Sequence, residues 1–310
     1  MKTAMKLQQL YFVYEVSRQG YNVSAAAEAL HATQPGVSNR IHQLEQELGV
    51  PIFERHGKRL TGMTPAGSAI LKMIERILRE VENIKQVSAE ATDEHQGILS
   101  IATTHTQARY VLPPVIKAFR DRYPQVRLRM FQGTPRQIAE MAAAGTVDLA
   151  IATEAIELFE DLIMLPCYEW NRSVVVPPTH PLLACQPLTL EAVAEYPIVT
   201  YVFGFTGRSK LDNAFTSKNL VPNVILTATD ADVIKTYLHL GLGIGIIASM
   251  AFDPDQDAPL KAINASHLFE PSTTHLGIRR GAYLRGYIYA FIELFSPRLT
   301  RQIVDAAVHA

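Results

Sequence analysis

Hydroxyl and amide side chains gather in four short segments of the second half of the chain. The segments are Thr103–Tyr110, Ile151–Glu154, Gly204–Arg208 and Asp230–Tyr237, and each follows a run of residues that predicts a β-strand. In open α/β sheets, ligands bind at the carboxyl ends of strands, where helix N-termini present free N–H groups. Threonine hydroxyls beside such donors would bind a small oxyanion without a cationic partner. Threonine also caps helices routinely, so any one of these residues could instead be structural.

The same four segments do not contain a recognisable set of residues for nucleophilic catalysis. A threonine nucleophile needs a positioned base, and His105 is the only histidine nearby. No third residue is recognisable in the sequence, so we predict that the chain is not an enzyme. Three glycines, Gly241, Gly243 and Gly245, loosely resemble a dinucleotide loop, but they follow a predicted helix and enter a predicted strand. That order favours a helix-ending turn, and we predict no cofactor.

The cysteines carry no signal for a disulfide framework or a metal site. Cys167 and Cys185 are the only two, and no Cys/His cluster has zinc spacing. We interpret them as structural thiols in a reducing cytoplasm.

A second group of polar residues lies near the N-terminus, on two short predicted helices. Asn22 or Ser24 could cap the first, and Thr33 could cap the second, with Pro35 in its first turn. Val37, Ile41, Leu44 and Leu48 would form one buried stripe. A helix, a tight turn and a polar-faced helix form the helix-turn-helix geometry, although two short helices could belong to any helical domain. The side chains available to phosphates and base edges are Ser24, Thr33, Gln34, Pro35, Ser38, Asn39 and Arg40.

A basic run follows these helices. Gly49–Phe53 ends the second helix and starts a strand, and Leu60-Thr61 returns as another strand. The run Arg55–Arg59 would then lie at the tip of a hairpin. Such a hairpin beside a recognition helix is a wing, and its Arg55, Lys58 and Arg59 could bind the phosphates of DNA. Taken alone, the run could also be a solvated turn.

A long helix is predicted after Thr64-Pro65, which suit the cap and first helical positions. Its apolar residues recur every three or four positions, at Ile70, Ile74, Ile77, Val81, Ile84 and Val87. A small winged domain cannot bury so long a stripe, so we predict a coiled-coil-like contact with a second copy. Packing on the chain's own C-terminal domain is the alternative.

The second half of the chain reads as an α/β domain after a linker near residues 92–97. Short β-branched runs alternate with amphipathic segments, which favours a largely parallel sheet. Strands are predicted at Ile98–Thr103, Val126–Phe131, Val147–Thr153, Ser173–Val176, Ile198–Val202, Val224–Thr227, Ile244–Ala248 and Thr274–Ile278. Helices are predicted at Val115–Arg122, Gln137–Ala144, Leu190–Ala194, Arg208–Ser217, Ala231–Leu240 and Leu284–Leu294.

Composition constrains the class of protein but not its function. With 310 residues, 48% of them hydrophobic, the chain is long enough for two or three compact units. The net charge is −1, and residues 1–95 carry eleven basic and eleven acidic side chains, so any DNA contact must come from a local patch. The absence of a long apolar run or a secretory signal predicts a cytoplasmic protein that does not bind membranes.

Residues 7–67 resemble the N-terminal domain of LysR-type transcriptional regulators. The resemblance rests on ordered matches at Ala26–Leu30, Thr33–Ser38, Ile41–Glu45, Leu48–Arg55 and Leu60–Gly67. It implies double-stranded promoter DNA as a partner, homo-oligomers of two or four copies, and RNA polymerase as a further partner.

The C-terminal half resembles the branch of this family that activates cysteine biosynthesis or sulfonate utilisation. The matches are Ile101–Tyr110, Met164–Tyr168, Trp170–Ser173, Phe203–Arg208 and Asp230–Tyr237. Those at Leu165–Tyr168 and Phe203–Arg208 favour the cysteine activators. The resemblance implies two α/β subdomains with a cleft that binds sulfate, O-acetylserine or N-acetylserine. By matching position, the effector residues would be Thr104, Thr106, Gln107, Thr153, Thr206 and Trp170.

The predicted architecture has three parts. A winged helix-turn-helix spans residues 1–63, a dimerisation helix 64–92, and a periplasmic-binding-protein-like α/β sensor domain 97–310. Subdomain I of the sensor would cover about residues 97–165 and 268–310, and subdomain II about 166–267. We predict a regulator of sulfur assimilation, with a sulfonate-responsive regulator, an anion carrier and a sulfur-metabolism enzyme as alternatives.

Overall fold

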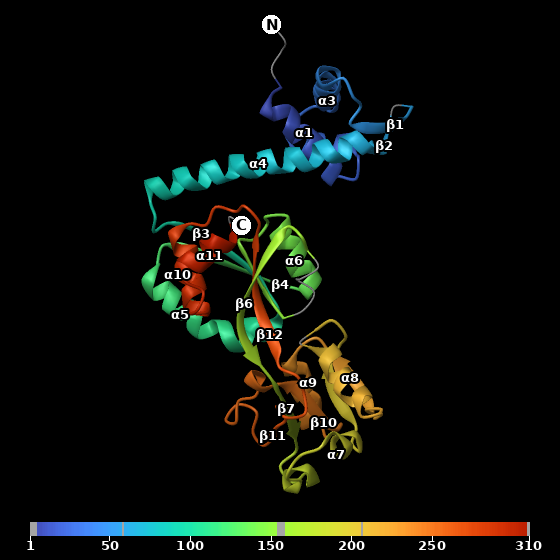
Figure 1. Cartoon of the computed structure of the whole chain (residues 1–310), viewed down its shortest axis with the longest axis vertical. Helices are drawn as coiled ribbons and strands as arrows, with labels where there is room; N and C mark the ends of the chain where they lie inside the picture. Colours follow the sequence, from blue (N-terminus) through green and yellow to red (C-terminus); the bar gives the residue numbers. More distant parts are fainter. Residues whose placement is uncertain (1–4, 58, 154–158, 206, 309–310) are drawn as a thin grey trace. The chain divides into compact units, whose positions relative to one another are not determined.

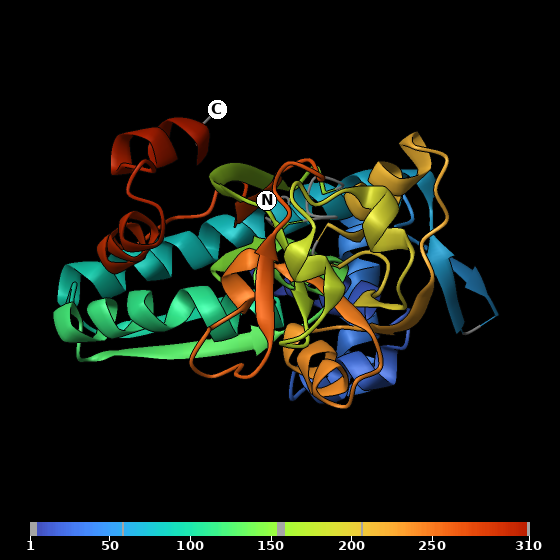
Figure 2. The same cartoon turned by 90° about the horizontal axis from the view of Figure 1, so that it is seen from below.

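The computed structural model describes residues 5–57, 59–153, 159–205 and 207–308. The chain divides into an N-terminal unit, residues 1–89, and a C-terminal unit, residues 90–310. The first unit holds α1, α2, α3, a hairpin and most of the long helix α4, which can be followed in Figures 1 and 2. Their bounds are α1 Leu7–Arg18, α2 Val23–Ala29, α3 Gln34–Leu48, β1 Phe53–His56, β2 Arg59–Met63 and α4 Pro65–Thr92.

Capping residues start the helices of the N-terminal unit where the sequence predicted. The Asn22 side chain accepts the N–H groups of Ser24 and Ala25 at the start of α2. The Thr33 hydroxyl accepts the Gly36 N–H at 3.3 Å at the start of α3, and the Thr64 hydroxyl accepts the Gly67 N–H at 2.8 Å at the start of α4. These caps satisfy N–H groups that have no partner within the helix.

The apolar stripe of α3 differs from the prediction at its end. Val37, Ile41 and Leu44 are buried, but Leu48 is 40% exposed. The buried position one turn from Ile41 belongs to Glu45, whose carboxylate accepts the N–H groups of Ile52 and Phe53 at 2.9 and 3.2 Å. A carboxylate therefore fixes the turn into the hairpin where we expected packing by a leucine.

The C-terminal unit contains two five-stranded sheets. Each sheet has its own helices (Figure 1). The first sheet has the order β4-β3-β5-β12-β6 and the second β11-β7-β10-β8-β9. The strands are β3 Gly97–Thr103, β4 Val126–Gln132, β5 Leu149–Ala152, β6 Leu162–Trp170, β7 Arg172–Val176, β8 Ile198–Tyr201, β9 Val224–Ala228, β10 Ile244–Ala248, β11 Lys261–Asn264 and β12 Ser272–Arg279.

Alternation along the strands gives each sheet two apolar faces. In the first sheet, Leu99, Ile101 and Leu149 pack beneath α5, α10 and α11, whereas Ala102 and Ala150 pack against α6. The second sheet is covered by α7 and α8 on one face and by α9 on the other. The helical segments are η1 Gln107–Val111 (a π-helix), α5 Leu112–Arg122, α6 Pro135–Ala143, η3 Pro181–Ala184, α7 Leu190–Ala194, α8 Arg208–Ser217, α9 Ala231–His239, η4 Ser249–Ala251, α10 Gly286–Phe295 and α11 Arg301–Val308.

The sheets are mixed, not largely parallel as predicted. In the first sheet, β3 runs parallel to β4 and β5, but β12 runs antiparallel to β5 and β6. In the second, β8 is parallel to β9 and β10, while β7 is antiparallel to β10 and β11. The antiparallel pairs all involve β12 or β7, strands that enter a sheet after the chain has crossed from the other one.

The chain crosses between the sheets twice, and the first crossing lies later than predicted. Strand β6 stays paired with β12 as far as Trp170, opposite Ser272, so the crossing falls at Asn171 and not near residue 165. The Asn171 side chain donates to the carbonyl groups of Ser266 and Phe269 in the returning segment, at 3.1 and 3.0 Å. One amide therefore ties the two crossing segments together.

No helix among the described residues combines the length and the apolar character that a membrane span requires.

Candidate functional site

Helices α2 and α3 present the polar surface that the sequence predicted for DNA. Thr33, Gln34, Pro35 and Asn39 are exposed around the first turns of α3, and Ser24 is exposed on α2. Ser38 and Arg40 are half-buried on the same helix. The opposite side of α3 packs into the core through Val37, Ile41 and Leu44, so the polar side chains face away from that core.

The β1–β2 hairpin projects beyond the helices of the N-terminal unit (Figure 2). Of the three predicted phosphate contacts, Arg59 is exposed and Lys58 lies outside the described residues. The Arg55 guanidinium donates to Glu45 at 2.8 Å, on the carboxylate that also holds the Ile52 and Phe53 N–H groups. Arg55 therefore links the hairpin to α3.

The apolar stripe of α4 divides into a buried and an exposed part. Ile74 and Leu78 belong to the core of the N-terminal unit. Ile77, Ile84 and Val87 are 40%, 68% and 46% exposed, and Val81, which lies between Ile77 and Ile84 in the sequence, is half-buried. A row of exposed apolar side chains over three turns is a surface that a partner would have to cover.

Five of the six predicted effector residues line one hollow in the C-terminal unit. Thr104, Thr106 and Gln107 follow β3, Thr153 follows β5 and Trp170 ends β6, so all come from carboxyl ends of strands of the first sheet. Pro135, at the start of α6, completes the wall of what we call the threonine hollow. The sixth residue, Thr206, lies outside the described residues.

Hydrogen bonds connect these residues through two side chains that the sequence did not single out. The Thr274 hydroxyl, fully buried on β12, accepts from the Gln107 amide at 3.2 Å and from the Trp170 indole at 3.1 Å. The Tyr168 hydroxyl donates to the other end of the Gln107 amide. Burial raises the pKa of Tyr168 to about 12, so this phenol keeps its proton at neutral pH. Gln107 and Trp170 therefore belong to one polar network.

The second sheet approaches the hollow through Tyr201. Its hydroxyl is bonded to Thr106 and accepts the Ala248 N–H at 3.3 Å. Nearby, the buried Arg172 guanidinium donates to the Gly207 carbonyl at 2.6 Å and to the Ser272 hydroxyl at 3.3 Å. A side chain at Gly207 would meet that guanidinium at 2.0 Å, so glycine is needed at the start of α8.

A cluster around Asp232 on α9 joins the second sheet to the turn that carries Thr106 and Gln107. The Tyr110 hydroxyl donates to Asp232, and Arg109 and His105 lie 3.5 and 3.7 Å from the same carboxylate. Burial disfavours the charged form of Asp232, but the Tyr110 hydrogen bond and the Lys235, His105 and Arg109 charges outweigh it and lower the pKa. We call this group the Asp232 clasp.

Neither a metal nor an enzymatic role follows from the clasp. His105, Asp230 and Asp232 could bring ligand atoms within 4.8 Å of one another, but Arg109 and Lys235 lie 3.5 Å from the Asp232 carboxylate and would repel a cation. Asp232 could act as the third residue beside a threonine and His105, which was not recognisable in the sequence. The buried Nδ1 of His105 has no hydrogen-bond partner among the described residues, so no threonine is coupled to it there.

The threonine hollow is small. Its volume is about 10 Å³, the space of about one water-sized sphere. A tetrahedral anion or an amino-acid derivative is larger, so either would need the hollow to widen.

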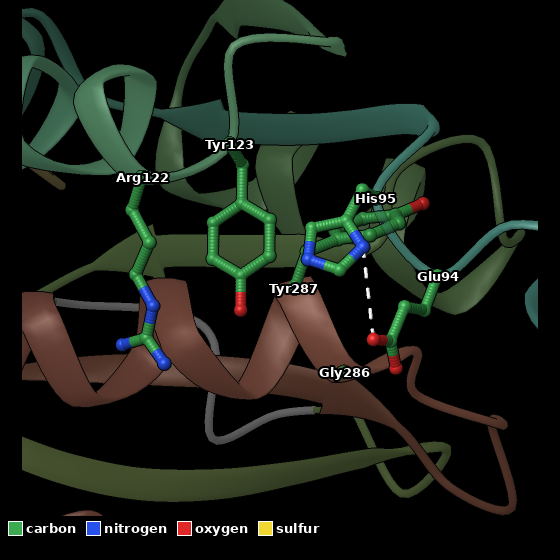
Figure 3. A pocket seen from close by; sticks show the side chains of 6 residues that line it. All are labelled: Glu94, His95, Arg122, Tyr123, Gly286 and Tyr287. Atoms are coloured by element: carbon green, nitrogen blue, oxygen red, sulfur yellow. Dashed lines mark ion pairs between the residues drawn. The ribbon is translucent and has the colours of Figure 1, made fainter.

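A second, larger hollow of about 260 Å³ lies at the other end of the first sheet (Figure 3). Glu94 and His95 pair across its rim at 3.6 Å, and the Tyr123 ring lies 5.9 Å from the His95 ring. Arg122 and Tyr287 also line it. Its charged side chains are largely exposed, unlike those of the threonine hollow.

The cysteines are free thiols, as predicted. Cys167 is buried among apolar side chains of the first sheet, and burial raises its pKa to about 12. A thiol that stays protonated is a poor nucleophile and a poor metal ligand.

Two family models match the chain. Residues 7–68 match the bacterial regulatory helix-turn-helix protein of the lysR family, and residues 92–300 match the LysR substrate binding domain. Together they cover both units and confirm the predicted fold class.

Named relatives match over nearly the whole length. The transcriptional regulator SsuR of Burkholderia cenocepacia is 53% identical over 95% of this chain and 96% of its own. The regulator CysB of Haemophilus influenzae is 51% identical over 98% of this chain and 94% of its own. A crystal structure of the cofactor-binding domain of the Cbl regulator is 44% identical, covers 69% of this chain and 95% of that domain, and has a TM-score of 0.67.

These relatives are named as transcriptional regulators and not as enzymes, which confirms that this chain is a regulator without a catalytic role. The helix-turn-helix match, the substrate-binding match and the whole-length identities agree, and the chain belongs to the LysR family of transcriptional regulators.

Proposed function

We propose that this chain is a cytoplasmic, homo-oligomeric regulator of sulfur assimilation that binds promoter DNA and responds to a small sulfur-linked effector. The effector would be sulfate, O-acetylserine or N-acetylserine, bound in the threonine hollow without a metal or an organic cofactor. The active form would be a dimer or a tetramer that acts on RNA polymerase at the promoter. The three parts of the chain would be residues 1–63 for DNA, 64–92 for dimerisation and 97–310 for the effector.

The DNA contact would use α3 in the major groove. A polar helix surface of this kind donates to base edges and phosphates, as Gln34, Ser38, Asn39 and Arg40 could do. Ser24, Thr33 and Pro35 would position the helix against the backbone, and the hairpin would add Arg55, Lys58 and Arg59. The exposed stripe at Ile77, Ile84 and Val87 would be covered by α4 of a second copy.

One observation carries the effector assignment. Residues from three distant parts of the sequence, which the resemblance named as ligands, line a single polar hollow at the carboxyl ends of strands. Hydroxyl and amide groups at such a position suit an oxyanion, as in other open α/β sheets. Single threonines that only capped helices would have no reason to converge there.

Coupling between effector binding and DNA binding would follow from the small size of the hollow. Because an effector needs more space than about 10 Å³, it would bind best when the two sheets stand further apart. A ligand that prefers one arrangement shifts the population toward it, and the arrangement of the paired N-terminal units would shift with it.

A sulfonate-responsive regulator is the second candidate. The chain has similar identity to SsuR, at 53%, and to CysB, at 51%, so identity does not separate the two branches that the sequence resembles. Both would use the same hollow, and the difference would lie in the effector that binds it.

The test is calorimetry on the full chain with sulfate and with acetylserine. Thr104→Val should weaken binding roughly ten- to a hundredfold, because a hydrogen bond to a charged ligand contributes about 1.5–3 kcal/mol. Thr189→Val is the control, since Thr189 caps α7 by accepting the Ala192 N–H at 3.2 Å, away from the hollow. It should lower the melting temperature and leave affinity intact. If Thr104→Val behaves like this control, the assignment of the hollow is wrong.

A further inference from the structure

We propose that Glu90 is a positioning residue that fastens the last turn of α4 to α10, and that this attachment carries the effector signal from the C-terminal unit to the DNA-binding part of the chain. Helix α4 ends at Thr92, and the C-terminal unit begins at Glu90, inside its last turn. The inference rests on the proposed function and deepens it, because it names the residue through which effector binding would change DNA binding.

Both oxygens of the Glu90 carboxylate accept hydrogen bonds from the segment that enters α10. One accepts the Gly286 N–H at 2.6 Å, and the other accepts the Tyr283 hydroxyl. These partners lie 196 and 193 residues further along the chain. The hydrogen bond to Glu90 raises the pKa of Tyr283, so the phenol keeps its proton and donates at neutral pH. Glu90 therefore holds this segment at two points.

Helix α10 depends on Glu90 for its first turn. Its own N-cap residue, Arg285, makes no capping hydrogen bond with its side chain. The first N–H groups of a helix have no partner within the helix, and the helix dipole favours negative charge at that end. Glu90 supplies the acceptor and the charge together. The start of α10 is thus fixed to the last turn of α4 by a residue of α4 itself.

Arg285 fastens the segment that follows α4. Its guanidinium donates to the Asp93 carbonyl at 2.6 Å and lies over the Tyr287 ring, 4.9 Å from its centre. The Tyr287 hydroxyl donates to the Ile98 carbonyl, at the start of β3, at 3.0 Å. A Cβ at Gly97 would lie 2.6 Å from the Tyr287 hydroxyl and 2.7 Å from the Arg285 guanidinium, so glycine is needed for this close approach. The linker after α4 is therefore held against the start of α10.

The other end of α10 reaches β6, which contributes to the threonine hollow. Ser296, which follows α10, donates its hydroxyl to the Cys167 carbonyl of β6 at 3.1 Å. The Phe295 ring lies 5.9 Å from the Tyr168 ring, and the Tyr168 hydroxyl donates to Gln107 in the hollow. Ten helical residues span about 15 Å, and seven of those in α10 are buried. A packed helix thus joins the surroundings of the hollow to Glu90.

These contacts would turn a change in the hollow into a change at α4. An effector that widens the hollow would displace Tyr168, and the packed Phe295 would move α10 with it. Because Glu90 holds the first turn of α10, the last turn of α4 would follow. Coupling between two sites requires an element whose arrangement both sites bias, and α10 with its attachment supplies it.

Glu82 provides the matched control on the same helix. It pairs within α4, with Lys85 at 3.2 Å and with Gln86 at 3.4 Å. Glu82→Ala therefore removes the same charge from α4 and makes the same change in side-chain size as Glu90→Ala, but it leaves the attachment to α10 in place.

The test compares Glu90→Ala with the parent in three measurements on the full chain. The Gly286 amide should exchange its hydrogen roughly tenfold faster or more, because it loses a charged acceptor. Calorimetry with sulfate and acetylserine should give affinities close to those of the parent. Gel shifts on a sulfur-gene promoter should show that the effector-induced change in DNA affinity, about 5- to 150-fold for a typical coupling, falls toward onefold. Tyr283→Phe, which removes only one hydroxyl donor, should have a smaller effect in the same direction.

Each result supports or overturns the inference. Parent-like exchange of the Gly286 amide in Glu90→Ala would show that Glu90 does not hold α10, whichever effector acts. Faster exchange with an undiminished effector response would show that the attachment carries no signal. An equal loss of response in Glu82→Ala would assign the effect to weakening of α4 in general.

Failure of the proposed function would look different. If the parent binds neither sulfate nor acetylserine, or if its promoter affinity responds to neither, the proposed function and the signalling role of Glu90 both fail. If the parent responds and Glu90→Ala responds equally, the proposed function stands and only the role of Glu90 is wrong.

Discussion

The DNA-facing surface and the threonine hollow are built in opposite ways. The first is one face of a 15-residue helix, and its polar side chains lie at the surface. The second is assembled from strand ends, and Thr104, Thr106 and Gln107 are only 8%, 3% and 2% exposed. Gln107 and Trp170 in the hollow are already hydrogen-bonded to Thr274, whereas the α3 side chains extend from a capped and packed scaffold.

The difference reflects what each surface must recognise. A duplex offers an extended groove, and side chains that can adjust at the surface suit base edges and phosphates. A small anion is surrounded on all sides, so every donor must be placed in advance and its direction fixed. The buried Glu45 carboxylate performs for the hairpin what Thr274 performs for the hollow, since each holds neighbouring donors in place.

The largest effect is expected at the exposed stripe of α4, because it involves whole copies of the chain. Ile77→Asp would place a charge in the apolar contact proposed between two copies, at a cost of about 3 kcal/mol of association free energy. Sedimentation should show smaller particles, and cooperative operator binding should fall, with effector affinity unchanged.

Lys72→Asp on the exposed polar side of the same helix serves as the control and should keep the parent's mass. A folded Ile77→Asp variant with the parent's mass and cooperativity would show that this stripe is not the contact between copies.

Substitutions on the DNA-facing surface of α3 should have an intermediate effect, on operator affinity. Arg40→Ala on α3 should weaken operator binding by about 1–3 kcal/mol if Arg40 reads a base, and loss of a phosphate contact would weaken specific and nonspecific sites alike. Gel shifts at fixed salt on operator and random DNA separate these cases. Thr104→Val in the absence of effector should leave both affinities intact. Parent-like operator affinity for Arg40→Ala would remove this residue from the interface.

The Asp232 clasp should give the smallest effect. Its lowered pKa means that the clasp contributes fully at neutral pH and is lost as the pH falls through that pKa, below the usual carboxylate range. Since the Asp232 side chain is 40% exposed, we expect less than about 1 kcal/mol. As the pH is lowered, the melting temperature of the parent should fall more steeply than that of Asp232→Asn. Asp121→Asn, at an exposed pair with Lys117, is the control, and equal slopes for Asp232→Asn and the parent would contradict the clasp.

Local sequence was enough to predict most of the N-terminal unit. Caps at Asn22, Thr33 and Thr64 lie beside the helices that they start, and the hairpin follows the helix-ending Gly49. The exception was Leu48, because the Glu45 carboxylate finds its N–H partners seven and eight residues away, across the turn.

Long-range pairing explains what the sequence did not reveal in the C-terminal unit. Strand β6 escaped prediction because Pro166 interrupts it, and an edge strand tolerates proline where a central strand does not. Thr274 lies 167 residues from Gln107 and 104 from Trp170, so no local pattern joins them. The threonines after β3 were visible because they are neighbours in sequence, whereas Thr274 is far from them in sequence.

We propose that a small effector in the threonine hollow changes how this chain binds its promoter DNA. Footprinting on sulfur-gene promoters, with and without sulfate, acetylserine and a sulfonate, tests it most directly. We predict that one of these ligands changes the protected region for the parent chain and has no effect on Thr104→Val, which still protects the promoter. Identical protection by the parent under all conditions would contradict the claim.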